Sequence, residues 1–90
     1  MAHSLSAKKR IRQDVKRNAR NRWRKRQMRG VVRDFERAVD AGDLDGAAQR
    51  LQQCYKVLDR VADKGIIHKN AAGRKKARLA RRLSRARSGA

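Results

Sequence analysis

The 90-residue sequence has no proline, one cysteine and three aromatic residues, and its 27 Lys and Arg residues far outnumber its eight acidic ones. Without proline, little interrupts the segments rich in Ala, Leu, Arg, Lys and Gln, a composition that favours long helices over strands. A chain of this length with three aromatics builds only a slim core. These absences predict an all-α protein with a single domain over residues 1–90.

The shortage of cysteine and histidine excludes several kinds of site. Cys54 has no second cysteine with which to form an internal disulfide, and His3 and His68 do not make a metal-ligand spacing. Cys54 is therefore expected to be a small residue on a buried helix face. The sequence also lacks a Ser–His–Asp grouping, a glycine-rich phosphate loop and a carboxylate pair in an apolar setting. We expect no enzyme activity, no cofactor, no metal and no small-molecule substrate.

Long hydrophobic runs are also missing. No apolar stretch approaches the ~18 residues that a membrane span requires, and the start of the chain lacks the apolar centre of a signal peptide. A cationic amphipathic helix that coats membranes is a weaker alternative, because the first 27 residues have too little hydrophobic face. The sequence therefore predicts a cytoplasmic protein without a membrane partner.

Basic residues dominate the chain and are unevenly placed. Residues 1–40 contain 14 Lys or Arg and four acids, residues 41–63 contain three and four, and residues 64–90 contain ten and none. A net charge of +19 on so small a chain indicates a phosphate-rich partner. Arg outnumbers Lys, which favours forked contacts with phosphate oxygens. Two basic arms separated by a neutral spacer predict a clamp for folded nucleic acid.

The first predicted helix covers about residues 7–41, with Ser6 as its N-cap and Gly30 as a weak point inside it. Its second half carries apolar residues three and four apart, as a bundle core requires. They are Met28, Val31, Val32, Phe35, Ala38 and Val39. Its first half has only a narrow stripe with a four-residue repeat, namely Ile11, Val15, Ala19 and Trp23. This half is expected to project beyond the bundle and lie along a ligand.

Two further helices follow. The break at Ala41–Asp43, with Asp43 or Asp45 as a cap, precedes a strongly amphipathic segment over about 44–64. Gly65 suits a left-handed helix stop, and a third helix is predicted over about 68–87. Its apolar residues are Ala72, Leu79, Leu83 and Ala86. Since the first connection is short, the helices should alternate in direction. The predicted fold is a three-helix up-down-up bundle with an extended, projecting first helix.

Several motifs of the sequence resemble the family of bacterial small-subunit ribosomal protein twenty. The most specific is KGIIHKN at Lys64–Asn70; the others are SAKKR at Ser6–Arg10, the pair Lys16-Arg17, Asn21, AGD at Ala41–Asp43, and Arg74 with Lys76. The resemblance covers about residues 6–83. It implies a structural constituent of the small ribosomal subunit that binds small-subunit ribosomal RNA directly and early in assembly. It also implies that the protein clamps the 5′ domain and the long penultimate stem, with other small-subunit proteins touched only peripherally.

The expected RNA contacts lie on the two basic arms. By resemblance they are Lys8, Lys9, Arg10, Lys16, Arg17 and Asn21 in the first helix, and Lys64, Gly65, His68, Lys69, Asn70, Arg74 and Lys76 around the hinge and third helix. The basic faces of the same two segments add Arg12, Arg20, Arg24, Lys75, Arg78 and Arg82. Because A-form RNA hides its major-groove base edges, recognition should depend on backbone shape.

Some alternatives stay open on the sequence alone. Trp23 either stacks on an exposed base, packs against a helix or makes a cation–π contact. His68 is expected to be a cap or a phosphate contact rather than a proton switch. An architectural DNA-binding protein is the rival function, although wedge residues between basic ones are absent except Ile11. Without RNA, residues 7–27 are expected to be poorly helical because their like charges repel.

Overall fold

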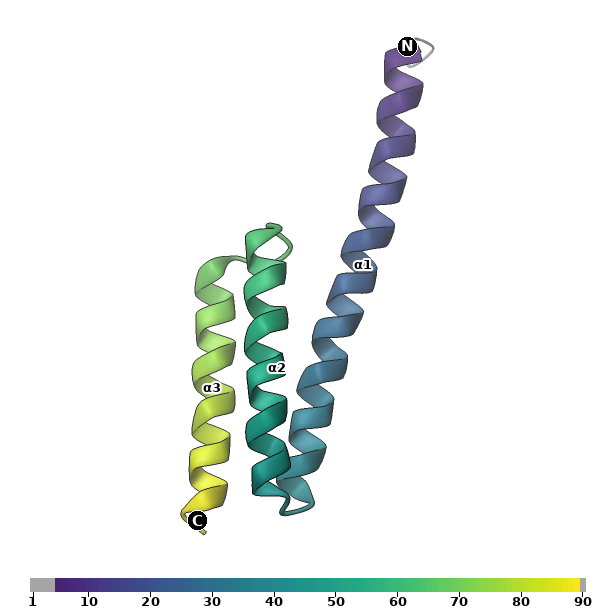
Figure 1. Ribbon diagram of the computed structural model, residues 1–90. Coiled ribbons are helices and arrows are strands. Elements are labelled where there is room, and N and C mark those ends of the chain that lie inside the picture. Colours follow the sequence, from purple (N-terminus) through teal and green to yellow (C-terminus); the bar gives the residue numbers. More distant parts are fainter. Residues whose placement is uncertain (1–4, 90) are drawn as a thin grey trace.

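The computed structural model describes residues 5–89, which form three helices and no strand (Figure 1). Helix α1 is Leu5–Asp40, α2 is Leu44–Asp63 and α3 is Lys69–Arg87. The helices alternate in direction, with α2 between the other two. The predicted up-down-up bundle is therefore confirmed, and the predicted helix bounds differ from the observed ones by at most two residues.

Helix α1 overshoots its partners. Its 36 residues span about 54 Å, whereas the 20 residues of α2 span about 30 Å. The molecule measures 63 × 22 × 16 Å, and its radius of gyration of 17.8 Å exceeds the ~12 Å of a compact chain of this length. Residues 8–20 are all exposed. The predicted projection of the first half of α1 is confirmed.

The predicted start of the first helix was wrong by two residues. Helix α1 already includes Leu5, so Ser6 lies within its first turn and is not its N-cap. Lys9 stands where a capping box needs Glu or Gln, so no reciprocal bond favours a start at Ser6. Met1–Leu5 has no periodic apolar pattern, which favours a loose segment; of this segment, residues 1–4 lie outside the described part of the chain.

Both helix stops are glycine turns of the Schellman type. Gly42 and Gly65 have φ of 76° and 74°. At the second stop, the Gly65 amide donates to the Ala62 carbonyl at 3.0 Å and the Ile66 amide donates to the Val61 carbonyl at 2.9 Å. After the first stop, the Asp43 carboxylate accepts from the Gly46 amide at 3.0 Å and caps α2. The predicted helix stop at Gly65 and the cap at Asp43 are confirmed.

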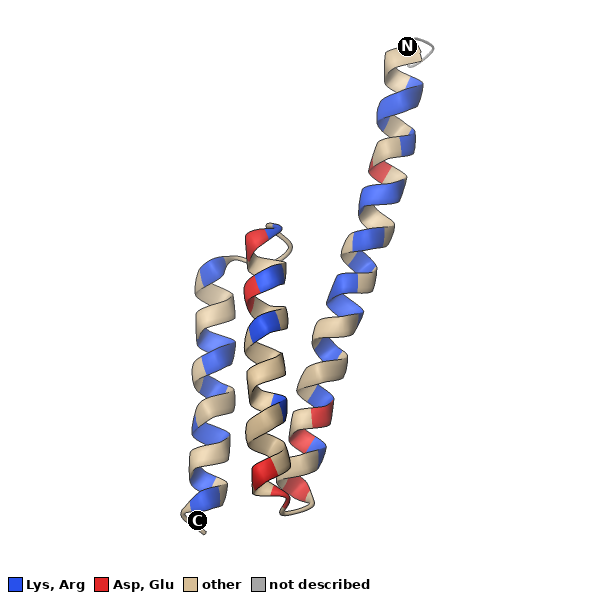
Figure 2. Cartoon of the chain, viewed as in Figure 1, with Lys and Arg blue, Asp and Glu red and all other residues tan. Residues whose placement is uncertain are grey.

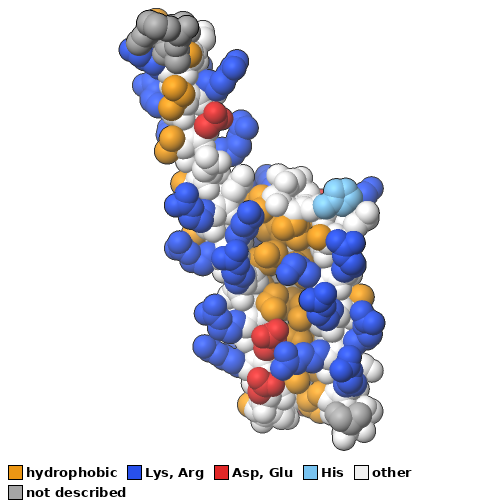
Figure 3. All heavy atoms as spheres, turned by 180° about the vertical axis from the view of Figure 1, so that it is seen from behind, with side chains coloured by type: hydrophobic (Ala, Val, Ile, Leu, Met, Phe, Trp, Pro, Cys, Tyr) orange, Lys and Arg blue, Asp and Glu red, His pale blue; other side chains and the backbone are white. Residues whose placement is uncertain are grey.

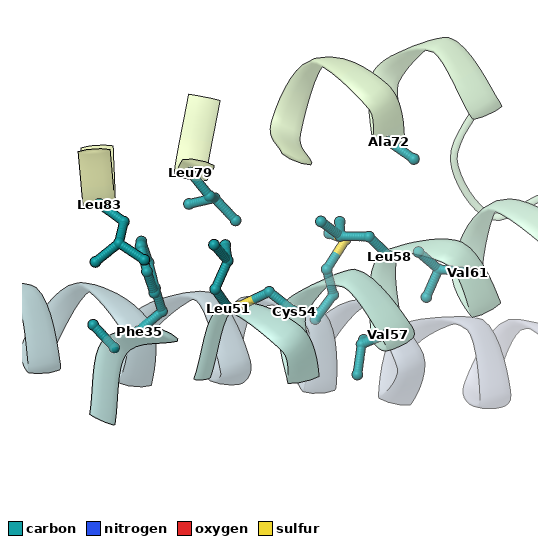
Figure 4. Close-up of a cluster of buried hydrophobic side chains, with 11 residues drawn as sticks. Phe35, Leu51, Cys54, Val57, Leu58, Val61, Ala72, Leu79 and Leu83 are labelled. Carbon is teal, nitrogen blue, oxygen red and sulfur yellow. The ribbon is translucent and has the colours of Figure 1, made fainter. Parts of the chain in front are cut away.

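One buried cluster draws on all three helices (Figure 4). Phe35 of α1, Leu58 of α2 and Leu83 of α3 are almost completely buried. Because α2 packs against both outer helices, its buried arc is wider than one amphipathic stripe. This explains why Val57, which was not among the expected core residues, is buried as well. The predicted burial of Cys54 is confirmed.

Gly30 provides a test of the continuity of α1. It lies inside the helix, and a Cβ atom built at this position meets nothing within 4 Å. Gly30→Ala should therefore raise the free energy of unfolding by about 1 kcal/mol, through better helix propensity and a less flexible unfolded chain. Urea unfolding followed by circular dichroism measures this change. Gly65→Ala is the matched control, because its positive φ makes the same substitution destabilising.

Candidate nucleic-acid interface

Lys and Arg recur along the whole projecting part of α1 (Figure 2). The predicted contacts on this segment are exposed: Lys8, Lys9, Arg10, Arg12, Lys16, Arg17 and Arg20. Asn21 and Arg24, where the segment meets the bundle, are half-buried. Asp14 is the one acid of this segment, whereas five of the eight acids lie between residues 34 and 45, around the α1–α2 turn. The charged residues of the projecting segment are thus almost all positive, and we call this segment the α1 arm (residues 5–27).

The hinge between α2 and α3, residues 64–68, is built so that its polar groups face outward. Lys64, Gly65, His68, Lys69 and Asn70 are all exposed. His68 is the N-cap of α3, and its Nδ1 accepts from the Asn70 amide at 3.1 Å. The predicted capping role of His68 is confirmed. Since Nδ1 accepts this bond, the proton of the neutral ring is on Nε2, which is a free donor toward a phosphate.

The exposed cations of α3 lie next to the hinge. Arg74, Lys75 and Arg78 are exposed, and none of them forms an ion pair within residues 5–89. Gly73, before them, is also exposed. A row of cations costs free energy through mutual repulsion, which a polyanion removes. We call residues 64–78 the hinge arm.

Two of the predicted contact residues instead have acidic partners inside the bundle. Lys76 pairs with Asp59 of α2, and its Nζ lies 5.6 Å from the centre of the Tyr55 ring. Arg82 donates to Asp40 at 2.8 Å and lies 3.5 Å from Glu36, both on α1. Surface pairs of this kind contribute at most about 1 kcal/mol each. Lys76 and Arg82 therefore link helices to one another, which distinguishes them from the other predicted residues.

A groove lies between α1 and α3 on the face seen in Figure 3. Met28, Val32 and Leu79 form its apolar lining, and basic side chains border it on both sides. The bordering residues are Arg29, Arg33 and the acidic Glu36 of α1, and Lys75 and Arg78 of α3. Arg29 and Arg33 were not predicted as contacts. Their four-residue spacing beside the apolar stripe of α1 is the signal that could have identified them.

The two arms meet at the same end of the bundle. In Figure 1 the hinge is at the end of the bundle from which α1 continues alone, and α1 diverges from α2 there. Both arms are held by one core, because α1 and α3 each pack against α2. The two sets of predicted residues therefore meet at one end of the bundle, on opposite sides of α2.

Other kinds of site find little support in the described residues. Burial, and next the charge of Asp34, raise the pKa of the Cys54 thiol from 9.0 to about 11. The thiol donates to the Val31 carbonyl at 3.3 Å, so it is not a poised nucleophile. Within residues 5–89, no three His, Cys, Asp or Glu side chains are grouped to hold a metal ion. No helix in that range is both long and apolar enough to cross a membrane.

The sequence matches a known protein family over most of its length. Residues 2–84 match the family model described as ribosomal protein S20. A small ribosomal subunit protein bS20 from Clostridioides difficile is 49% identical over 93% of the chain and 96% of the relative. Proteins of the same name from Rhodopseudomonas palustris and Syntrophobacter fumaroxidans are 46% and 44% identical, again over 93% of the chain, and over 96% and 98% of the relatives.

Proposed function

The chain belongs to the ribosomal protein S20 family and is a structural constituent of the small ribosomal subunit, and from this premise we propose that it clamps small-subunit ribosomal RNA between its two basic arms. The family consists of structural proteins, so the prediction that the chain is not an enzyme is confirmed. Membership in this family also places the protein in the cytoplasm, on the ribosome, as the sequence predicted.

The observation that carries the proposal is the pairing of two exposed basic arms on one rigid core. Asp14 is the one acid within the two arms, and Asp59 of α2 pairs with Lys76 of the hinge arm. An anion held by only one arm would leave the other arm's repulsion unrelieved. Two RNA segments, one on each arm, would relieve the repulsion within both arms.

The two RNA segments we propose are the 5′ domain and the long penultimate stem. The α1 arm would lie along the backbone of one segment, since 11 of its 23 residues are Lys or Arg. The hinge arm would contact the other through Arg74, Lys75, Arg78 and the Nε2 proton of His68. Direct phosphate contacts of this kind fix position and register, with little reading of base edges. Neighbouring small-subunit proteins would be touched only at the rim.

Lys76 and Arg82 contribute less to RNA binding in this proposal. Their ion pairs with Asp59 and Asp40 must break or be shared before either side chain can donate fully to a phosphate. The residues with unpaired cationic groups need no such exchange. We therefore assign the direct contacts mainly to the unpaired residues, while Lys76 and Arg82 keep α3 in place beside its partners.

The test compares binding to small-subunit ribosomal RNA with binding to duplex DNA of equal length at about 200 mM salt, where non-specific binding is weak. Specific complexes are typically 10³-fold or more tighter than non-specific ones, and a preference of that order for the RNA is expected. Equal binding to both would indicate a general polyanion binder and favour the architectural DNA-binding alternative.

The clamp itself is tested by dividing the RNA. Fragments that contain only the 5′ domain or only the penultimate stem should each bind more weakly than RNA that contains both, because the second contact becomes intramolecular. Equal affinity for one fragment and the complete RNA would show that a single arm is enough. Circular dichroism during the same titrations should report a gain of helix in residues 7–27, whose side chains gain almost no packing from the bundle.

A further inference from the structure

Trp23 is the one tryptophan of the chain, and it lies on an apolar stripe that the bundle does not use. Its side chain is 58% exposed, and Ile11 and Val15 on the same stripe are 53% and 63% exposed. With 3.6 residues per turn, Val15 and the buried Phe35 lie on opposite faces of α1. No rotation of α1 can therefore bury both faces against α2 and α3.

Within the described residues, the indole of Trp23 has none of the intramolecular roles that the sequence left open. The cation–π contact found in residues 5–89 joins Lys76 to Tyr55. Trp23 is also absent from the buried cluster and from the side chains packed against it. More than half of the surface of Trp23 is thus available to a partner.

The surroundings of Trp23 indicate the chemistry of that partner. Arg22, Arg24, Lys25 and Arg26 adjoin it in the sequence, Arg20 lies one turn before it, and Ala19 leaves space on the stripe beside the ring. An apolar protein surface placed here would need a rim of acids to match this charge. A nucleobase presents a flat, apolar face flanked by phosphates, so it matches the ring and the cations together.

We propose that Trp23 stacks on an unpaired base of the ribosomal RNA that the α1 arm binds. This inference rests on the proposed RNA clamp and adds a contact with a base to its contacts with the backbone. Stacking accepts any base, so it selects an unpaired nucleotide at one position along the arm without reading its identity. Trp23 therefore fixes the register of the α1 arm on the RNA.

The experiment uses the single tryptophan as its own reporter. In the complex with small-subunit ribosomal RNA, the fluorescence of Trp23 should be quenched and the indole protected from acrylamide. Trp23→Leu should weaken this complex about 5- to 100-fold, which is the range for loss of one base–aromatic stack. The slope of affinity against salt should stay unchanged, since no phosphate contact is lost.

Two controls separate stacking from general packing. Trp23→Phe keeps a smaller aromatic ring and should retain most of the affinity. On a fully paired RNA duplex, Trp23→Leu and the unsubstituted protein should bind alike. Circular dichroism should be unchanged in both variants because the side chain is largely exposed.

The outcomes separate this inference from the clamp. An indole that stays fully accessible in the complex, an unchanged affinity of Trp23→Leu, or an equal loss on paired RNA would overturn stacking while selective RNA binding stands. If the unsubstituted protein does not prefer ribosomal RNA over DNA, the proposed function fails, and stacking fails with it.

Discussion

Replacing Arg74, Lys75 and Arg78 together with glutamine should weaken binding to small-subunit ribosomal RNA by roughly 30- to 100-fold at about 0.2 M salt. Each lost phosphate contact removes about 0.7–0.9 from the slope of log affinity against log salt concentration. The slope of the variant should therefore be smaller by roughly two to three. Filter binding or fluorescence titration over a series of salt concentrations measures both quantities.

The matched control removes the same charge from the neutral spacer. Arg50, Lys56 and Arg60 of α2 are exposed, like the three residues of α3, and lie outside both arms. Their replacement by glutamine should change the salt slope by much less. If the two triple variants lose affinity equally, net charge alone would govern binding, and the assignment of α3 to a defined contact surface would be wrong.

Phe35→Ala should lower the free energy of unfolding by about 3–5 kcal/mol, the usual cost of removing a buried aromatic side chain. Phe35 is fully buried and lies near Leu83 in the cluster that joins the three helices (Figure 4). Domains of this size are stable by only about 5–14 kcal/mol, so the loss is a large fraction of the total. Urea unfolding monitored by circular dichroism gives the value.

This substitution also tests whether the core holds the arms together. Phe35 carries no charge and lies away from both arms, so any loss of RNA affinity must arise through the fold. Saturating RNA should recover part of the lost stability, because it binds only the folded state. Phe35→Leu is the milder control. A loss below about 1 kcal/mol for Phe35→Ala would mean that the bundle does not depend on this cluster.

The sequence predicted most of the architecture because the signals for it are local. The glycine stops at Gly42 and Gly65 and the apolar repeat around Phe35 act over one or two helical turns. The spacing of the apolar residues also showed that the first half of α1 has a narrower apolar stripe than the second half. The limits of α1 were less certain, since Ser6 has no capping partner that would define a start there.

The features that the sequence did not reveal depend on contacts between distant residues. Arg82 meets Asp40 across 42 positions, a pairing that no spacing along the chain indicates. Lys76 has the same type of charge as Lys75 but points to Asp59, so its role follows from the packing of α3 on α2. Val57 is buried because α2 is the central helix. The groove border at Arg29 and Arg33 likewise depends on where α3 lies.

The gathering of acids around the α1–α2 turn gives the molecule an electric dipole along its long axis. The tip of the α1 arm is the more positive end, whereas near the turn Asp40, Asp43 and Asp45 offset the Arg side chains at the C-terminal end of α3. In the field of a polyanion, such a charge distribution produces a torque as well as an attraction. In the proposed clamp, the α1 arm would therefore reach the RNA first, with the molecule already oriented for the hinge arm to follow.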